Sequence, residues 1–141
     1  MDVCTIPFNN WLGMSSVATD TGTVVSLSPQ PHHLNHLGTV HAAVIFAAAE
    51  AASGQALLDH FADLADSAML VLRSSTTKYR APAVAGGPLT AQAHIGAEAV
   101  DAFRRQLASR GRALIEVTAG VVQDGQDVFR GTYTFFGAMH T

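Results

Sequence analysis

Charged residues are scarce in this chain of 141 residues. Only 13% of them are charged, against roughly 25% in an average soluble domain. Because so little charge is available to cover the surface, we expect an apolar face to be buried between subunits, in a homodimer or a dimer of dimers. The net charge of −3 argues against nucleic acid as a partner.

Cysteine is almost absent as well, since Cys4 stands alone. A single cysteine excludes an internal disulfide and a cysteine-based zinc site. Among the histidines, His32 and His33 are adjacent and point apart, so no metal site is predicted. The start of the chain carries Asp2 and no basic segment before an apolar run. No signal peptide is therefore expected, and the predicted location is the cytoplasm.

One long apolar run dominates the sequence. Between Val40 and Ala56 the only charged residue is Glu50, in a stretch rich in alanine, the strongest helix former. This predicts an α-helix over about residues 39–61, with Thr39 as its N-cap. A helix that is apolar on every face is a buried helix. The run is too short, and too soon interrupted by polar residues, to span a membrane.

The remaining patterns predict strands around that helix. A hairpin is expected over residues 15–28, strands over 68–79 and 89–95, and a second hairpin over 112–136 that turns at Asp124-Gly125. A second helix is expected over 97–110, ended by Gly111. The segment 7–14 places Phe8, Trp11 and Leu12 on one apolar face that would cap the core. The sequence thus predicts a single α+β domain, residues 1–141, with an antiparallel sheet wrapped around a central helix.

The stretch around Glu50 resembles a known family. In HLNHLGTVHAAVIFAAAEAASG, the positions of Asn35, His41 and Glu50 match the motif of the hotdog-fold acyl-CoA thioesterases of the phenylacetic-acid-pathway (PaaI-like) type. The segment STTKYRAPA, residues 75–83, resembles the strand of that family that ends in an aromatic-x-x-Pro-Ala pattern. The chain departs from the family in having Ala42-Ala43 where a Gly-Gly pair is usual, which narrows the approach to the helix N-terminus.

The resemblance implies a thioester hydrolase with four catalytic residues. Glu50 would act as general base or nucleophile, and apolar surroundings should raise its pKa. The Ala42 backbone N–H, in the first turn of the helix, would hold the thioester oxygen. Asn35 would hold the carbonyl or the water, and His41 would bind the thioester or orient Asn35. Each of the four also has a purely structural explanation. Glu50 could be a buried acid held by hydrogen bonds, and Ala42 an ordinary helix start. Asn35 could be a loop residue bonded to its own backbone, and His41 a packed neighbour.

The substrate would be an acyl-CoA, so that coenzyme A is part of the substrate and no other cofactor is expected. The polar middle of the strand 68–79 predicts a lined cleft or, alternatively, a strand edge facing water. The arginines of the helix 97–110 would hold the phosphates of coenzyme A or form a solvated helix face. The predicted substrate-binding residues are Gly54, Ser75, Thr76, Thr77, Arg80, Arg104 and Arg105.

Two other functions remain open at this stage. A hydratase or dehydratase on acyl thioesters pairs a histidine with an acid, and His36 precedes Glu50 by 14 residues. The Pro-Gly-rich loop of those enzymes is missing here, and Asn35 takes the thioesterase position. A non-catalytic acyl-CoA binding module would keep the cleft and would not need an acid.

Overall fold

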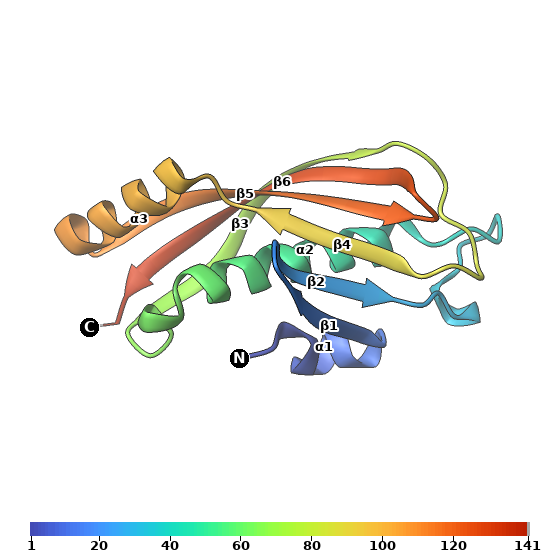
Figure 1. Cartoon of the computed structure of the whole chain (residues 1–141), viewed down its shortest axis with the longest axis horizontal. Coiled ribbons are helices and arrows are strands. Elements are labelled where there is room, and N and C mark those ends of the chain that lie inside the picture. Colours follow the sequence, from blue (N-terminus) through green and yellow to red (C-terminus); the bar gives the residue numbers. More distant parts are fainter. Residues whose placement is uncertain (141) are drawn as a thin grey trace.

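Six antiparallel strands form one sheet that curves around a long helix in the computed structural model (Figure 1). The structure describes residues 1–140. Along the sheet the strands follow the order β1-β2-β4-β5-β6-β3. They are β1 (Met14–Thr19), β2 (Gly22–Leu27), β3 (Ala68–Tyr79), β4 (Leu89–His94), β5 (Arg112–Gln123) and β6 (Gln126–Met139). The predicted α+β class is confirmed, and this arrangement is the hotdog fold.

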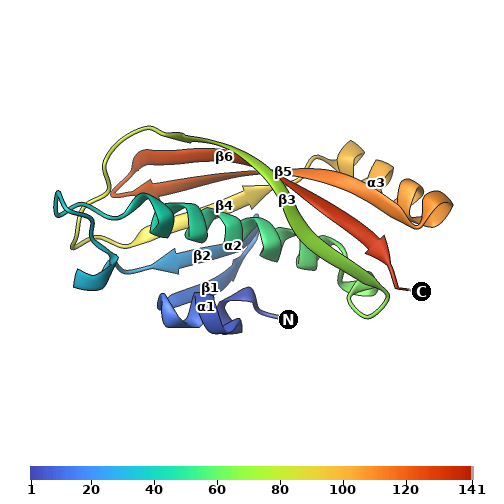
Figure 2. The same cartoon turned by 180° about the vertical axis from the view of Figure 1, so that it is seen from behind.

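The central helix α2 (Ala42–His60) lies along the inner face of the sheet, as Figure 2 shows from behind. Its alanines at positions 47, 48, 49, 51 and 52 are buried, because small side chains let the strands approach the helix closely. The helix has the length and composition of a membrane span, but 56% of the tested segment is buried inside the protein, as in a core helix.

The start of α2 differs from the prediction. Its N-cap is His41, whose Nδ1 accepts a hydrogen bond from the Ala43 N–H at 3.0 Å. Thr39 cannot serve as the cap because it is held outside the helix: its hydroxyl binds Asn35, and the neighbouring Val40 N–H donates to the Ala83 carbonyl at 2.8 Å. The helix therefore begins three residues later than predicted.

The second helix α3 (Ala97–Arg110) has the predicted bounds. Gly111 ends it in the left-handed conformation, with a φ of 67°, which glycine adopts at little cost. The Phe103 ring is fully buried and packs 4.9 Å from the Phe61 ring at the end of α2. The absence of a side chain at Gly137 makes room for Phe103, since a Cβ there would lie 2.5 Å from the ring.

The N-terminal segment packs on α2 in an unpredicted way. It consists of a 3₁₀ turn, η1 (Val3–Thr5), and the short helix α1 (Pro7–Trp11). Phe8 and Trp11 are exposed by 57% and 67%, so the predicted apolar face does not cap the core. Leu12 is the one residue of that predicted face that is buried, and Val3 and Asn9 are buried beside it.

Candidate active site

Glu50 lies midway along α2 with its carboxylate facing a small apolar cavity. The cavity has a volume of about 200 Å³, and its walls include Val3 and Ile6, Gly54 and Leu58, and Leu70 and Leu72. Within residues 1–140 no hydrogen bond or ion pair reaches the Glu50 carboxylate, and burial raises its pKa. A half-buried acid without a partner is costly for the fold, which favours a chemical role over a structural one.

Two tyrosines that the sequence did not single out lie beside this half of α2. The Tyr133 hydroxyl donates to the Phe46 carbonyl at 3.3 Å, one turn before Glu50, and the Tyr79 hydroxyl donates to the Ala42 carbonyl at 2.9 Å. The pKa of Tyr133 is raised by burial first, and then by the nearby charges of Tyr79 and Glu50. Both phenols therefore stay neutral and fix the helix against the sheet. The sequence signal for Tyr133 was its place on the same face of the predicted strand as Phe129 and Phe135.

The loop before α2 is tied together by its own polar groups. The Asn35 Oδ1 accepts from the N–H groups of Leu37 at 2.9 Å and Thr39 at 3.2 Å, while its Nδ2 donates to the Thr39 Oγ1 at 2.9 Å. This is the self-bonded asparagine of the structural alternative. An amide nitrogen has two hydrogens, so one donor of Asn35 stays available to a substrate.

His33 and His41 brace the same loop. His33 is buried and its Nδ1 accepts from the Gln30 N–H at 3.0 Å, while the His41 N–H donates to the His33 carbonyl at 2.8 Å. Burial and the neighbouring His32 lower the pKa of His33, so its ring is neutral. The His41 ring is used as the helix cap, and its exposed position leaves Nε2 open to solvent.

Ala42 is the first residue of α2, and its N–H has no acceptor within the described part of the chain. It is exposed and stands at the positive end of the helix dipole, as an oxyanion donor requires. Glu50 is eight positions further along the helix, which corresponds to about 12 Å along the helix axis. A carbonyl group cannot touch both, so a single chain does not bring these two predicted catalytic groups together.

The polar residues of β3 are divided between the two faces of the sheet. Residues directly opposite each other in an antiparallel pair share a face. Ser75 pairs with the buried Tyr133 and therefore lies on the helix side, as does Thr77, whereas Thr76 pairs with Thr132 on the outer face. Thr76 is therefore separated from Glu50 by the sheet itself. In the single chain the polar stretch of β3 faces solvent, which agrees with the water-facing alternative.

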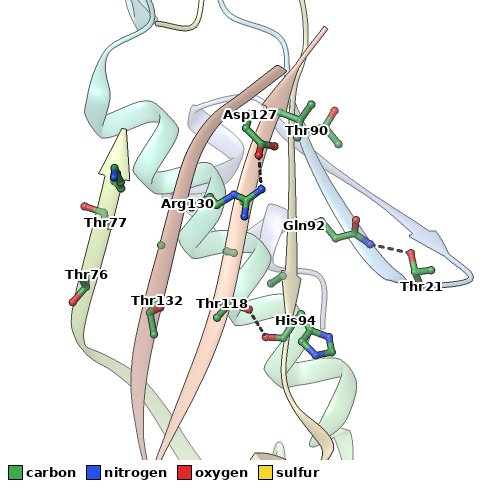
Figure 3. Close-up of a pocket in the computed structure, with 16 residues that line it drawn as sticks. Thr21, Thr76, Thr77, Thr90, Gln92, His94, Thr118, Asp127, Arg130 and Thr132 are labelled. Atoms are coloured by element: carbon green, nitrogen blue, oxygen red, sulfur yellow. Dashed lines mark hydrogen bonds and ion pairs between the residues drawn. The ribbon is translucent and has the colours of Figure 1, made fainter. Parts of the chain in front are cut away.

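The outer face carries a shallow polar groove of about 1010 Å³ (Figure 3). Thr76, Thr118 and Thr132 line it, together with an ion pair between Arg130 and Asp127. The Thr118 hydroxyl donates to the His94 carbonyl at 3.3 Å. The one acid that lines the groove, Asp127, is paired with Arg130, so the smaller cavity at Glu50 is the better candidate for chemistry.

The predicted arginines lie away from Glu50. The Arg104 guanidinium makes two bonds to the Asp63 carboxylate at 2.7 and 2.9 Å and a third to the His60 carbonyl. These bonds tie α3 to the end of α2 and lower the pKa of Asp63. Arg105 and Arg80 are exposed. A contact of any of them with coenzyme A stays a prediction.

Cys4 is a poor nucleophile despite its reactive side-chain type. It is buried, and burial together with the charge of Asp2 raises the pKa of its thiol to about 11. The thiol is therefore protonated at neutral pH, and only a thiolate attacks efficiently.

Comparison with known proteins agrees with this fold. A protein of unknown function from Pseudomonas aeruginosa, described as a probable thioesterase, superposes with a TM-score of 0.81 at 20% identity, over 98% of this chain and 91% of that one. A mutant of the phenylacetic acid degradation protein PaaI from Thermus thermophilus superposes with a TM-score of 0.71 at 24% identity, over 92% of this chain and 97% of that one. The PaaI protein of Escherichia coli superposes with a TM-score of 0.68 at 20% identity, over 89% of this chain and 84% of that one. No curated protein matches the sequence.

The class of protein follows from the strand order and these likenesses: the chain is a hotdog-fold protein, and its resemblance to the PaaI-like thioesterases is confirmed. Residues 12–136 match a family model described as a domain of unknown function, DUF4442, and the chain belongs to that family. At 20–24% identity the likeness establishes the fold, and activity has to be argued from the site.

Proposed function

We propose that this protein is an acyl-CoA thioesterase that hydrolyses a thioester to a free acid and coenzyme A. The observation that carries the proposal is the unpartnered Glu50 carboxylate, whose pKa is raised by burial, on the wall of an apolar cavity. Once ionised, such a carboxylate is a stronger base than one in water, and it would activate water or attack the carbonyl itself.

The test is hydrolysis of a panel of acyl-CoAs. Release of the coenzyme A thiol would be followed beside enoyl absorbance, because a hydratase changes the second signal and leaves the first unchanged. We expect thiol release by the wild-type protein and its loss in Glu50→Gln, which keeps the side-chain volume and removes the base. Turnover by Glu50→Gln near that of the wild type would remove Glu50 from the mechanism.

We also propose that the active site forms between two copies of the chain. The distance of about 12 Å between Ala42 and Glu50 supports this, because a second copy has to supply the donor for the thioester oxygen. The strand β3 is at the edge of the sheet and pairs only with β6 among the described strands, which leaves 12 residues of open edge. An open edge of that length is a template for pairing with another strand.

Mixing two inactive variants tests the shared site. Glu50→Gln lacks the acid, and Ala42→Pro lacks the N–H donor. In a random mixture of dimers, half are mixed and each mixed dimer holds one intact site, so about one quarter of wild-type activity should return. If both groups acted within one chain, mixing would restore nothing. Sedimentation that shows only a monomer at micromolar concentration would also refute the shared site.

The same proposal places the protein in the cytoplasm, with no partner other than the acyl-CoA substrate and a second copy of the chain. The location stays a prediction, as does the absence of a cofactor.

A further inference from the structure

The cavity beside Glu50 is almost free of polar groups. Apart from Glu50, the polar side chain on its wall is Asn9, whose Nδ2 donates to the Val3 carbonyl at 2.9 Å. No lysine or arginine lines it. A charge on the acyl group would leave water for these mostly apolar walls, where no charged side chain other than Glu50 faces it, which is costly. The cavity therefore selects an uncharged acyl group.

The N-terminal segment forms one wall of the cavity, and Gln55 holds that segment in place. Gln55 is buried, and its Oε1 accepts from the Val3 N–H at 2.9 Å. Its Nε2 donates to the Asp59 carboxylate at 2.9 Å and to the Met1 carbonyl at 3.3 Å. These bonds fix Val3, which is buried, against α2, whereas Met1 and Ile6 of the same wall are exposed.

Gly54 sets the width between α2 and this wall. Glycine inside a helix is unfavourable relative to alanine, so its position asks for a reason. A Cβ at Gly54 would lie 3.8 Å from the Val3 Cγ1, in ordinary contact. Alanine would therefore fit the fold, and what glycine preserves is the space of one methyl group inside the cavity.

We propose that residues 1–9 form the end wall of the acyl pocket, and that Val3 and Gly54 limit it to a compact, uncharged acyl group of benzoyl or hexanoyl size. This rests on the proposed hydrolysis at Glu50. A cavity of about 150 Å³ admits benzene. If a methylene fills about the volume of a water molecule, about 30 Å³, the cavity of about 200 Å³ holds six or seven carbons. A palmitoyl chain needs more than twice that space.

The test compares kcat/KM for acetyl-, hexanoyl-, benzoyl-, decanoyl- and palmitoyl-CoA. We expect hexanoyl- and benzoyl-CoA to be the best substrates, and decanoyl- and palmitoyl-CoA to be at least about tenfold poorer. One methyl group in an apolar pocket changes selectivity by about tenfold or more. Gly54→Ala should lower the hexanoyl-to-acetyl ratio by about that factor, and Val3→Ala should raise the decanoyl-to-hexanoyl ratio similarly.

Gly96→Ala is the matched control, because a methyl group there meets open space outside the cavity. It should leave both ratios unchanged, and circular dichroism should show that each variant is folded. If Val3→Ala does not fold, Gly54→Ala still tests the end wall, since the added methyl group fits beside Val3 without a clash. Calorimetric titration of hexanoyl- and palmitoyl-CoA into Glu50→Gln, with and without Val3→Ala, gives a readout that does not need catalysis.

The outcomes separate the two proposals. Hydrolysis without size selectivity, or with ratios that do not respond to Gly54→Ala, overturns the end wall and leaves the thioesterase proposal intact. Size-selective binding without hydrolysis by the wild type supports the end wall and overturns the thioesterase. If the protein neither binds nor hydrolyses any of these compounds, both proposals are overturned.

Discussion

Replacing Ala42 by proline removes the proposed oxyanion donor and little else. Proline is favoured at the first position of a helix, where its missing N–H has no helical partner. The preceding residue, His41, has φ −61° and ψ 138°, the extended conformation that a residue before proline prefers. Ala42 is exposed, so the ring has room. We therefore expect Ala42→Pro to fold with a stability within about 1 kcal/mol of the wild type.

Catalysis should respond very differently. Removing one oriented oxyanion donor typically costs about 3–4 kcal/mol, or about a hundredfold to a thousandfold in kcat. Because such a donor acts mainly in the transition state, kcat should fall more than KM rises. The assay is thiol release from the best acyl-CoA, with circular dichroism and thermal denaturation to confirm that the variant is folded.

Two controls separate the lost N–H from the added ring. Ala42→Gly keeps the N–H and should lower kcat by only a few-fold. Ala42→Val adds similar bulk and also keeps the N–H. If a folded Ala42→Pro retains near-normal kcat, the donor assignment is wrong. If the valine and proline variants lose activity equally, bulk at this position explains the loss and the backbone argument fails.

Other perturbations test the remaining parts of the site. Since burial raises the pKa of Glu50 above its value in the unfolded chain, ionisation of Glu50 lowers the stability of the fold. The Tm of Glu50→Gln should therefore match that of the wild type below about pH 4 and exceed it at pH 8. If Glu50 is the base, wild-type kcat should rise as the pH passes through the raised pKa. Asn35→Ala should lower kcat about a hundredfold, whereas Asn35→Asp retains the acceptor for Leu37 and Thr39 and should preserve the loop and Tm. Equal losses of kcat in folded forms of both variants would assign the effect to the amide donor. A pure KM effect would exclude a catalytic role for Asn35. Gln55→Ala leaves the buried Val3 N–H unpaired and should lower the free energy of unfolding by about 1–3 kcal/mol in urea titration.

Most of the fold could be predicted because its signals are local. The alanine-rich run predicted a buried helix, and Asp124-Gly125 predicted the last hairpin, in which Asp124 and Gly125 adopt φ values of 49° and 77°. The helix start could not be placed, because Thr39 is a good N-cap whose hydroxyl is bound by Asn35 four residues earlier, while a long-range bond from Val40 to Ala83 holds the chain outside the helix. Burial of the N-terminal segment was misread for a similar reason: the contact between Gln55 and Val3 spans 52 residues and leaves no periodic signal.

The candidate site was only partly predictable. An acid in an apolar helix is visible in the sequence, and Glu50 has the apolar surroundings expected. The role of Thr76 could not be judged from composition, because a strand sends alternate side chains to opposite faces and the direction depends on its partner. The register with β6 places Ser75 and Thr77 on the helix side and Thr76 opposite. The cavity wall around Gly54 could not be predicted, because it is formed by residues far apart in the sequence.

The geometry of α2 gives a physical reason why two copies would be needed. The free N–H of Ala42 is at the end of the helix, where the dipole favours a developing negative charge. Glu50 lies two turns further on, where burial raises its pKa. One helix cannot offer both environments at one point, because a base at the N-terminus would be stabilised as a carboxylate and would lose basicity. Two copies that bring the helix end of one chain to the acid of the other would combine the best donor with the strongest base.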